Sequence, residues 1–196
     1  MEVVDEICQL LDVKRETFER VWLDEYPARM TGDLEASMRR ACGALGAAGT
    51  HVPELVRLRV AAHTAMFVPR TDAVPTLAAL RERGLAIGLI TNCSSEVPEL
   101  WAASPLAALV DVTLFSAREG VKKPSPAIYE RASARLGVAP DACLFVGDGD
   151  GGELAGAAAV GMVPVLLDPG DTRPPEGWGG LRVERLAELP ALLDSL

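Results

Sequence analysis

The chain has 196 residues, of which 49% are hydrophobic and 24% charged, and its formal net charge is −9. A globular composition of this length can bury a sizeable core. Nucleic-acid binding requires a basic face, and no Lys/Arg run here is longer than two residues, so nucleic acid is excluded as a partner. No apolar run reaches the roughly 18 residues of a membrane span.

The cysteines and histidines show no metal-binding or disulfide pattern. The four cysteines form no CxxC pair, and His51 and His63 are too far apart for a helical metal pair, so we interpret both histidines as ordinary residues. The N-terminus is acidic, unlike a signal peptide. We therefore expect a soluble, cytoplasmic protein with reduced thiols.

Residues 1–68 are predicted to form four helices. Apolar residues recur at helical spacing in the first 26 residues, and two more amphipathic segments cover 34–45 and 53–67. An aromatic stripe that includes Trp22 and Tyr26 is interpreted as core packing rather than a cofactor site.

After residue 69 helices alternate with strands, which predicts an α/β fold with a parallel sheet and right-handed crossovers. Expected helices cover 73–83, 95–101, 125–136, 154–160 and 183–193, and expected strands cover 85–90, 110–115, 143–146 and 163–167. We expect Ser95 and Ser125 to cap the helices that follow them. Residues 168–180, rich in glycine and proline, are expected to form a loop.

The glycine-rich loop after strand 143–146 carries three carboxylates, Asp148, Asp150 and Glu153. These charges would repel one another unless a cation joined them, and a hard divalent ion with oxygen ligands fits such a set. Parallel strands place their carboxyl ends at one edge of the sheet, where open α/β sheets bind ligands. Thr91, Asn92 and Lys123 follow the two preceding strands, so we expect all these side chains to converge on one pocket.

Three stretches, LITN, GVKKP and VGDGDGGEL, resemble in this order the second, third and fourth motifs of the haloacid dehalogenase-like hydrolases. The resemblance covers almost the whole chain and is to the phosphatase-type branch with an inserted helical cap. It implies a Rossmann-like core domain at 69–196, with the four helices of 1–68 as its N-terminal cap.

The resemblance also implies roles for individual residues. Thr91, with Asn92 beside it, would hydrogen-bond the transferring phosphoryl group, and Lys123 would offset charge on the nucleophile and the phosphate. Asp148 and Glu153 would ligate Mg²⁺. The implied activity is Mg²⁺-dependent phosphoryl transfer from a small phosphorylated metabolite, with the oligomeric state left open. Phosphatase is favoured over dehalogenase because dehalogenation needs no metal.

The family's first motif, a strand ending in DxD that supplies the aspartate nucleophile, has no counterpart before the helical segment. Asp148–Asp150 has the DxD letters but already occupies the fourth-motif position. In the family this strand is central, so we predict unpaired backbone between strands 85–90 and 143–146 and an impaired enzyme. The alternatives are a non-catalytic binding or regulatory relative and an N-terminally truncated gene model.

Dinucleotide binding is a further alternative. Gly147, Gly149 and Gly152 spell GxGxxG between a strand and a helix, and Asp168 follows at about the distance of a ribose-binding acid. Against this alternative, Asp148 and Asp150 would face the pyrophosphate with like charge.

Overall fold

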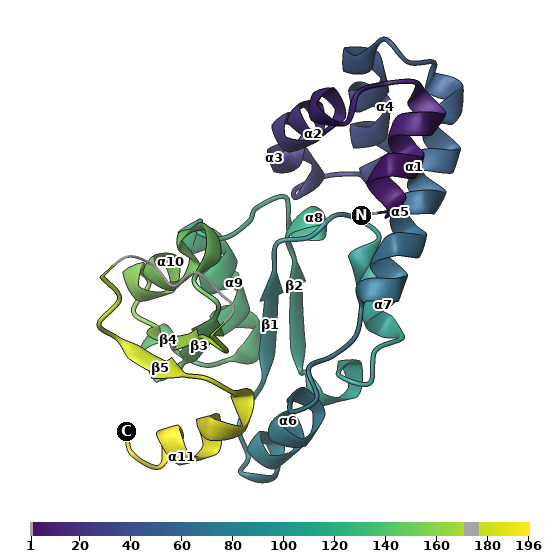
Figure 1. The fold of residues 1–196 in the computed structure, drawn as a ribbon. Helices are drawn as coiled ribbons and strands as arrows, with labels where there is room; N and C mark the ends of the chain where they lie inside the picture. Colours follow the sequence, from purple (N-terminus) through teal and green to yellow (C-terminus); the bar gives the residue numbers. More distant parts are fainter. Residues whose placement is uncertain (1, 171–176) are drawn as a thin grey trace. The chain divides into compact units, whose positions relative to one another are not determined.

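The computed structural model describes residues 2–170 and 177–196, and it divides into two compact units (Figure 1). Unit 1 comprises Met1–Val68 with two later segments, Asn92–Ala102 and Phe115–Gly120. Unit 2 comprises Pro69–Thr91, Ala103–Leu114 and Val121–Leu196. No helix in the described part of the chain is long and apolar enough to cross a bilayer. The assignment of residues 1–68 as cap and 69–196 as core domain stays a prediction.

Unit 1 is built from N-terminal helices around an apolar core (Figure 1). Its elements are α1 (Glu2–Leu11), α2 (Arg15–Asp24), α3 (Tyr26–Arg29), α4 (Leu34–Leu45), the 3-10 turn η1 (Gly49–His51) and α5 (Val52–Met66). Helix α1 packs on α2 and α5, and α4 packs on the same two helices. Their apolar faces meet in one core, which contains Ile7, Phe18, Leu34, Met38, Val52 and Leu55.

The ends of α4 explain why this helix covers the predicted residues. The Asp33 carboxylate accepts the N–H of Ala36 at 2.9 Å, and Gly46 closes the other end in the left-handed region with φ of 69°. The expected role of Ser95 was wrong. Its hydroxyl accepts the N–H of Leu34 at 2.9 Å, so it contributes to the start of α4, and the helix after it, α7 (Val97–Ala102), begins two residues later.

Unit 2 alternates strands and helices as expected for an α/β fold. Its elements are α6 (Ala73–Glu82), β1 (Gly88–Thr91), β2 (Val112–Phe115), α9 (Pro126–Leu136), β3 (Leu144–Gly147), α10 (Glu153–Ala159), β4 (Val163–Leu167), β5 (Leu181–Val183) and α11 (Leu189–Leu193). A short helix, α8 (Ser116–Glu119), follows β2 in the chain, belongs to unit 1 and was not expected. The expected loop at 168–180 lies partly outside the described residues.

The C-terminal strands form a parallel three-stranded sheet in the order β3–β4–β5. Leu144 pairs with Val163, and Val165 pairs with Leu181. The prediction of a helix over 183–193 was therefore wrong at its start. The segment from Leu181 to Val183 alternates apolar, polar, apolar, so it can pair with β4, and the helix is confined to Leu189–Leu193.

In the described residues β1 and β2 form a separate two-stranded sheet rather than continuing the sheet of β3. One core nevertheless serves both sheets. Helix α9 contributes Ile128 and Tyr129, which lie in the same cluster as Leu114 of β2 and Phe145 of β3. The structure thus shows that β1 and β3 belong to different sheets. That a central strand between them is missing stays a prediction.

Candidate functional site

Two of the expected site residues form a buried ion pair in unit 2. Lys123 Nζ lies 2.5 Å from Glu153 Oε2, and only 16% and 6% of the two side chains are exposed. Lys123 lies between α8 and α9, after β2 in the chain. Glu153 is the first residue of α10, after β3. The pair therefore joins two segments that follow different strands. The ammonium also lies 5.6 Å from the centre of the Phe145 ring in β3. This packing fixes the charge of a flexible side chain at one position.

The glycine at the end of β3 permits this arrangement. A Cβ atom at Gly147 would lie 2.0 Å from Glu153 Oε1, so no larger residue leaves room for the carboxylate. The same oxygen accepts the backbone N–H of Gly149 at 3.2 Å, and Gly149 has a φ of 87°, which favours glycine. The glycines of the loop therefore allow its backbone to close around the Glu153 carboxylate.

Close packing of α10 holds the loop that carries Lys123. The Tyr129 hydroxyl donates to the Glu153 carbonyl at 2.8 Å, and burial raises the pKa of this phenol, so it remains a donor. A Cβ atom at Gly156 would meet the Pro124 carbonyl oxygen at 2.7 Å. Pro124 follows Lys123 through a cis peptide bond. Tyr129 of α9 thus holds the start of α10, and α10 packs closely against the residue that follows Lys123.

Asp148 differs from Glu153 because its side chain is exposed. Its Oδ1 accepts the N–H of Asp150 at 3.0 Å, which stabilises the turn of the loop. Glu153 begins α10 in the same loop and binds the N–H of Gly149, next to Asp148 in the chain. Lys123, Glu153 and the Asp148 loop therefore occupy one region of unit 2.

The described residues could supply a magnesium ion with one exposed carboxylate, that of Asp148, but not with a complete set of ligands. Among residues 2–170 and 177–196, no three His, Cys, Asp or Glu side chains gather into a metal site. Both oxygens of Glu153 are engaged, by Lys123 and by the Gly149 N–H. Mg²⁺ commonly binds through one or two carboxylates together with water and substrate phosphate. Asp148 is suited to such a shared ion, whereas Glu153 would first have to release Lys123.

The other two expected residues lie at the end of β1. Thr91 is the last residue of this strand and is half-buried in unit 2. Asn92, the next residue, belongs to unit 1, where the N–H of Cys93 donates to the Ser116 hydroxyl at 2.9 Å. The division between the units thus falls between the two residues that were expected to act together.

The structure gives the dinucleotide alternative no support. Asp168, its expected ribose ligand, is 3% exposed, and its carboxylate lies 2.8 Å from Arg182 of β5. The other carboxylate oxygen accepts the N–H of Gly170 at 3.0 Å. Asp168 therefore connects β4 to β5 instead of facing a ligand.

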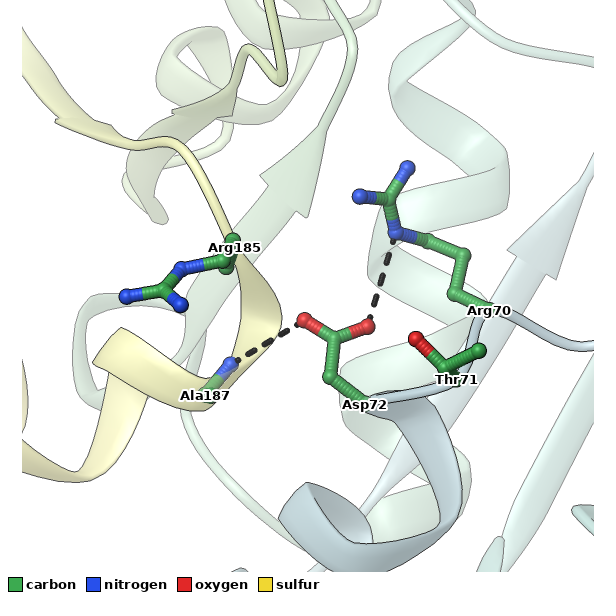
Figure 2. A pocket seen from close by; sticks show the side chains of 5 residues that line it. All are labelled: Arg70, Thr71, Asp72, Arg185 and Ala187. Carbon is green, nitrogen blue, oxygen red and sulfur yellow. Dashed lines mark hydrogen bonds and ion pairs between the residues drawn. The ribbon is translucent and has the colours of Figure 1, made fainter.

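A hollow of about 440 Å³ elsewhere in unit 2 is lined by Arg70, Thr71, Asp72, Arg185 and Ala187 (Figure 2). The Asp72 carboxylate lies 3.6 Å from Arg70 Nε and accepts the Ala187 N–H at 3.4 Å. Arg185 pairs with Glu188 at 3.3 Å. Each charged side chain that lines the hollow is therefore already in an ion pair. We interpret the hollow as the junction between the start of α6 and the segment before α11.

Unit 1 contains a polar cluster that the sequence analysis missed, formed by Arg29, Arg59, His63, Ser94 and Glu96. Glu96 is 8% exposed, and its Oε1 accepts a hydrogen bond from Ser94 at 2.8 Å and lies 2.7 Å from His63 Nδ1. Burial by itself would raise the pKa of Glu96, but the contacts with His63 and Ser94 outweigh it and hold the pKa below its ordinary value. His63, interpreted above as ordinary, is therefore part of a largely buried polar network.

An α/β unit whose strand ends carry a hydroxyl, a lysine and carboxylates has the layout of a hydrolase that acts on an anionic substrate at the sheet edge. A family model described as haloacid dehalogenase-like hydrolase matches residues 4–161. The chain therefore belongs to the haloacid dehalogenase-like hydrolases, which confirms the predicted family and its parallel α/β fold class.

Several curated relatives are phosphatases. The chain is 39% identical over 144 residues to phosphatase MT3486 of Mycobacterium tuberculosis, a match covering 72% of this chain and 62% of that protein. It is 34% identical over 123 residues to the glyceraldehyde 3-phosphate phosphatase of Methanopyrus kandleri, covering 60% of this chain and 53% of that protein. The chain thus spans less than two thirds of the length of these relatives.

Solved structures agree on the fold. A HAD phosphatase from Thermococcus onnurineus superposes with a TM-score of 0.72 at 23% identity, covering 98% of this chain and 86% of that chain. A 2-haloacid dehalogenase from Pseudomonas syringae superposes with a TM-score of 0.68 at 27% identity, covering 92% and 79%. Phosphatase and dehalogenase share this fold, so the choice between them depends on the site.

Proposed function

We propose that this hydrolase belongs to the phosphatase branch and binds the phosphoryl group of a small phosphorylated metabolite at the Lys123 loop, with Mg²⁺ as cofactor. The observation that carries this proposal is the buried Lys123–Glu153 pair beside the glycine loop of Asp148. The names of the curated relatives, among them a glyceraldehyde 3-phosphate phosphatase and a phosphoserine phosphatase, agree with a small phosphate ester as substrate.

Each residue has a defined role in this proposal. Lys123 neutralises charge on the phosphoryl oxygens, and Glu153 positions the lysine, so that little reorganisation is needed when substrate binds. The Thr91 hydroxyl, with Asn92 beside it, hydrogen-bonds the phosphoryl group. Asp148 would hold Mg²⁺, which supplies further charge neutralisation on the phosphate when bound. Positioning and electrostatics account for most of the rate in phosphoryl transfer of this kind.

The second candidate is a non-catalytic protein that binds a phosphorylated ligand. None of the site residues assigned above is an aspartate nucleophile that accepts the phosphoryl group, and this favours the second candidate.

A phosphatase assay with Mg²⁺ tests both candidates. A panel of phosphate esters is assayed with this chain and with a chain extended by a hydrophobic strand that ends in DxDGT, and we expect Mg²⁺-dependent turnover by the extended chain. Turnover by either form would contradict the non-catalytic candidate. If neither form turns over any ester while both bind phosphate, the non-catalytic candidate is favoured.

The role of Asp148 can be separated from that of its neighbour. In an active, extended chain, Asp148→Asn should abolish Mg²⁺-dependent turnover without changing the circular dichroism melting curve. Asp150→Asn removes the same charge from the same loop and should retain turnover, which makes it a matched control. Unchanged turnover in Asp148→Asn would remove the metal assignment.

A further inference from the structure

The buried cluster of unit 1 holds a guanidinium group that is almost fully removed from water. Arg29 is 5% exposed, and its guanidinium carbon lies 3.8 Å from the centre of the Trp22 ring. One nitrogen, Nη1, donates to the Trp22 carbonyl at 2.8 Å, whereas the buried Nε has no hydrogen-bond partner. Arginine side chains that stack on tryptophan in this way are well oriented but retain unused donors.

A second arginine faces the same ring. The Arg59 guanidinium lies 5.7 Å from the centre of the Trp22 ring, and its Nε is also buried without a hydrogen-bond partner. Its side chain is 22% exposed and that of His63 is 19% exposed, so these two side chains of α5 are partly accessible to solvent.

The charges within the cluster do not balance. Glu96 Oε1 lies 3.9 Å from Arg59 Nε, and the Oε2 of the same carboxylate is buried without a hydrogen-bond partner. Glu25, the other neighbouring carboxylate, pairs with Arg40 at 2.8 Å. Two guanidinium groups thus share one carboxylate, and an uncompensated charge of this kind is expensive to bury. Burial, together with the charge of Arg59, lowers the pKa of Arg29 to about 10.

We propose that Arg29 and Arg59 form a binding site for a compact oxyanion, a carboxylate or a phosphate group, which completes the charge balance of the cluster. The planar forks of two arginines match the geometry of such anions. This site lies within unit 1 and does not depend on the proposed function.

Isothermal titration calorimetry with malonate and with inorganic phosphate as probes tests the site. Wild-type protein should bind at least one probe, and Arg59→Gln should weaken that binding by about tenfold or more. Arg57→Gln is the matched control, because Arg57 lies on the same helix, is 61% exposed and pairs with Glu54. Inorganic phosphate can also bind at the Lys123 loop, so only the binding that Arg59→Gln weakens is assigned to the arginine site. Equal affinity in Arg59→Gln and wild type, or no binding of either probe by the wild type, would overturn the proposal.

A second measurement uses the wild-type protein alone. Two arginine Nε–H signals in its ¹H–¹⁵N spectra should shift during the titration. Titration without any shift among these signals would also overturn the site. An inactive extended chain that still binds the probe would contradict the proposed function alone, whereas an active chain with unchanged affinity in Arg59→Gln would contradict this site alone.

Discussion

The pairing of Lys123 with Glu153 changes the role that each residue can have. The resemblance implied that Glu153 is a metal ligand and that Lys123 faces the phosphate. In the structure the two charges neutralise each other in a region where both side chains are buried. We infer that Glu153 acts first on the lysine, by fixing its position, and that this fixed cation is what attracts the substrate.

Removing one member of the pair should leave a buried, uncompensated charge. We predict that Lys123→Met lowers the free energy of unfolding by about 3 kcal/mol at pH 7. Adding Glu153→Gln, which removes the charge at nearly constant size, should recover much of this loss. Urea denaturation of the two variants and the wild type measures both effects, and a Lys123→Met variant as stable as the wild type would contradict the prediction.

Helix α4 shows how backbone conformation decides what a glycine contributes to an element. Gly43 lies within the helix and Gly46 lies at its end with a φ of 69°, yet a Cβ atom at either position would meet nothing within 4 Å. Only the backbone conformation differs between the two sites. One type of substitution should therefore have opposite effects at positions three residues apart.

We predict that Gly43→Ala raises the free energy of unfolding by about 0.5–1 kcal/mol, because alanine loses less entropy in a helix than glycine. Gly46→Ala should lower it by about 1–2 kcal/mol, because a side chain is strained in the left-handed region. Thermal or urea denaturation of the two variants provides the comparison. A stabilising Gly46→Ala would indicate that the end of α4 can unwind without cost.

At the scale of the whole molecule, the net charge of −9 governs its encounters with other polyanions. The local cations identified here, Lys123 and the Arg29–Arg59 pair, are buried or half-buried and suit small anions rather than a polymer. We predict that the protein does not retard duplex DNA in a gel at physiological salt. Retardation that weakens as salt is raised would contradict this prediction, because it would reveal phosphate neutralisation by a basic face.

The sequence by itself determined the family, the helical character of residues 1–68 and most elements of the α/β unit. These features depend on signals that lie close together in the chain. Helix α9 is an example. Ser125 and Pro126 mark its start and Gly137 marks its end, and each signal lies next to the helix end that it predicts. The GVKKP and VGDGDGGEL stretches likewise predict Lys123 and Asp148 as site residues from adjacent letters alone, and this assignment stays a prediction.

Only the tertiary structure decided which side chains meet. Glu153 is 30 residues from Lys123, and the cluster of Arg29, Arg59 and Glu96 joins two segments of unit 1, Met1–Val68 and Asn92–Ala102. Strand β5 was missed because a three-residue strand has little periodicity of its own and depends on its pairing with β4. Local propensity specifies each helix and strand. The partner of a buried charge depends instead on how distant elements pack, because only packing removes the charge from water.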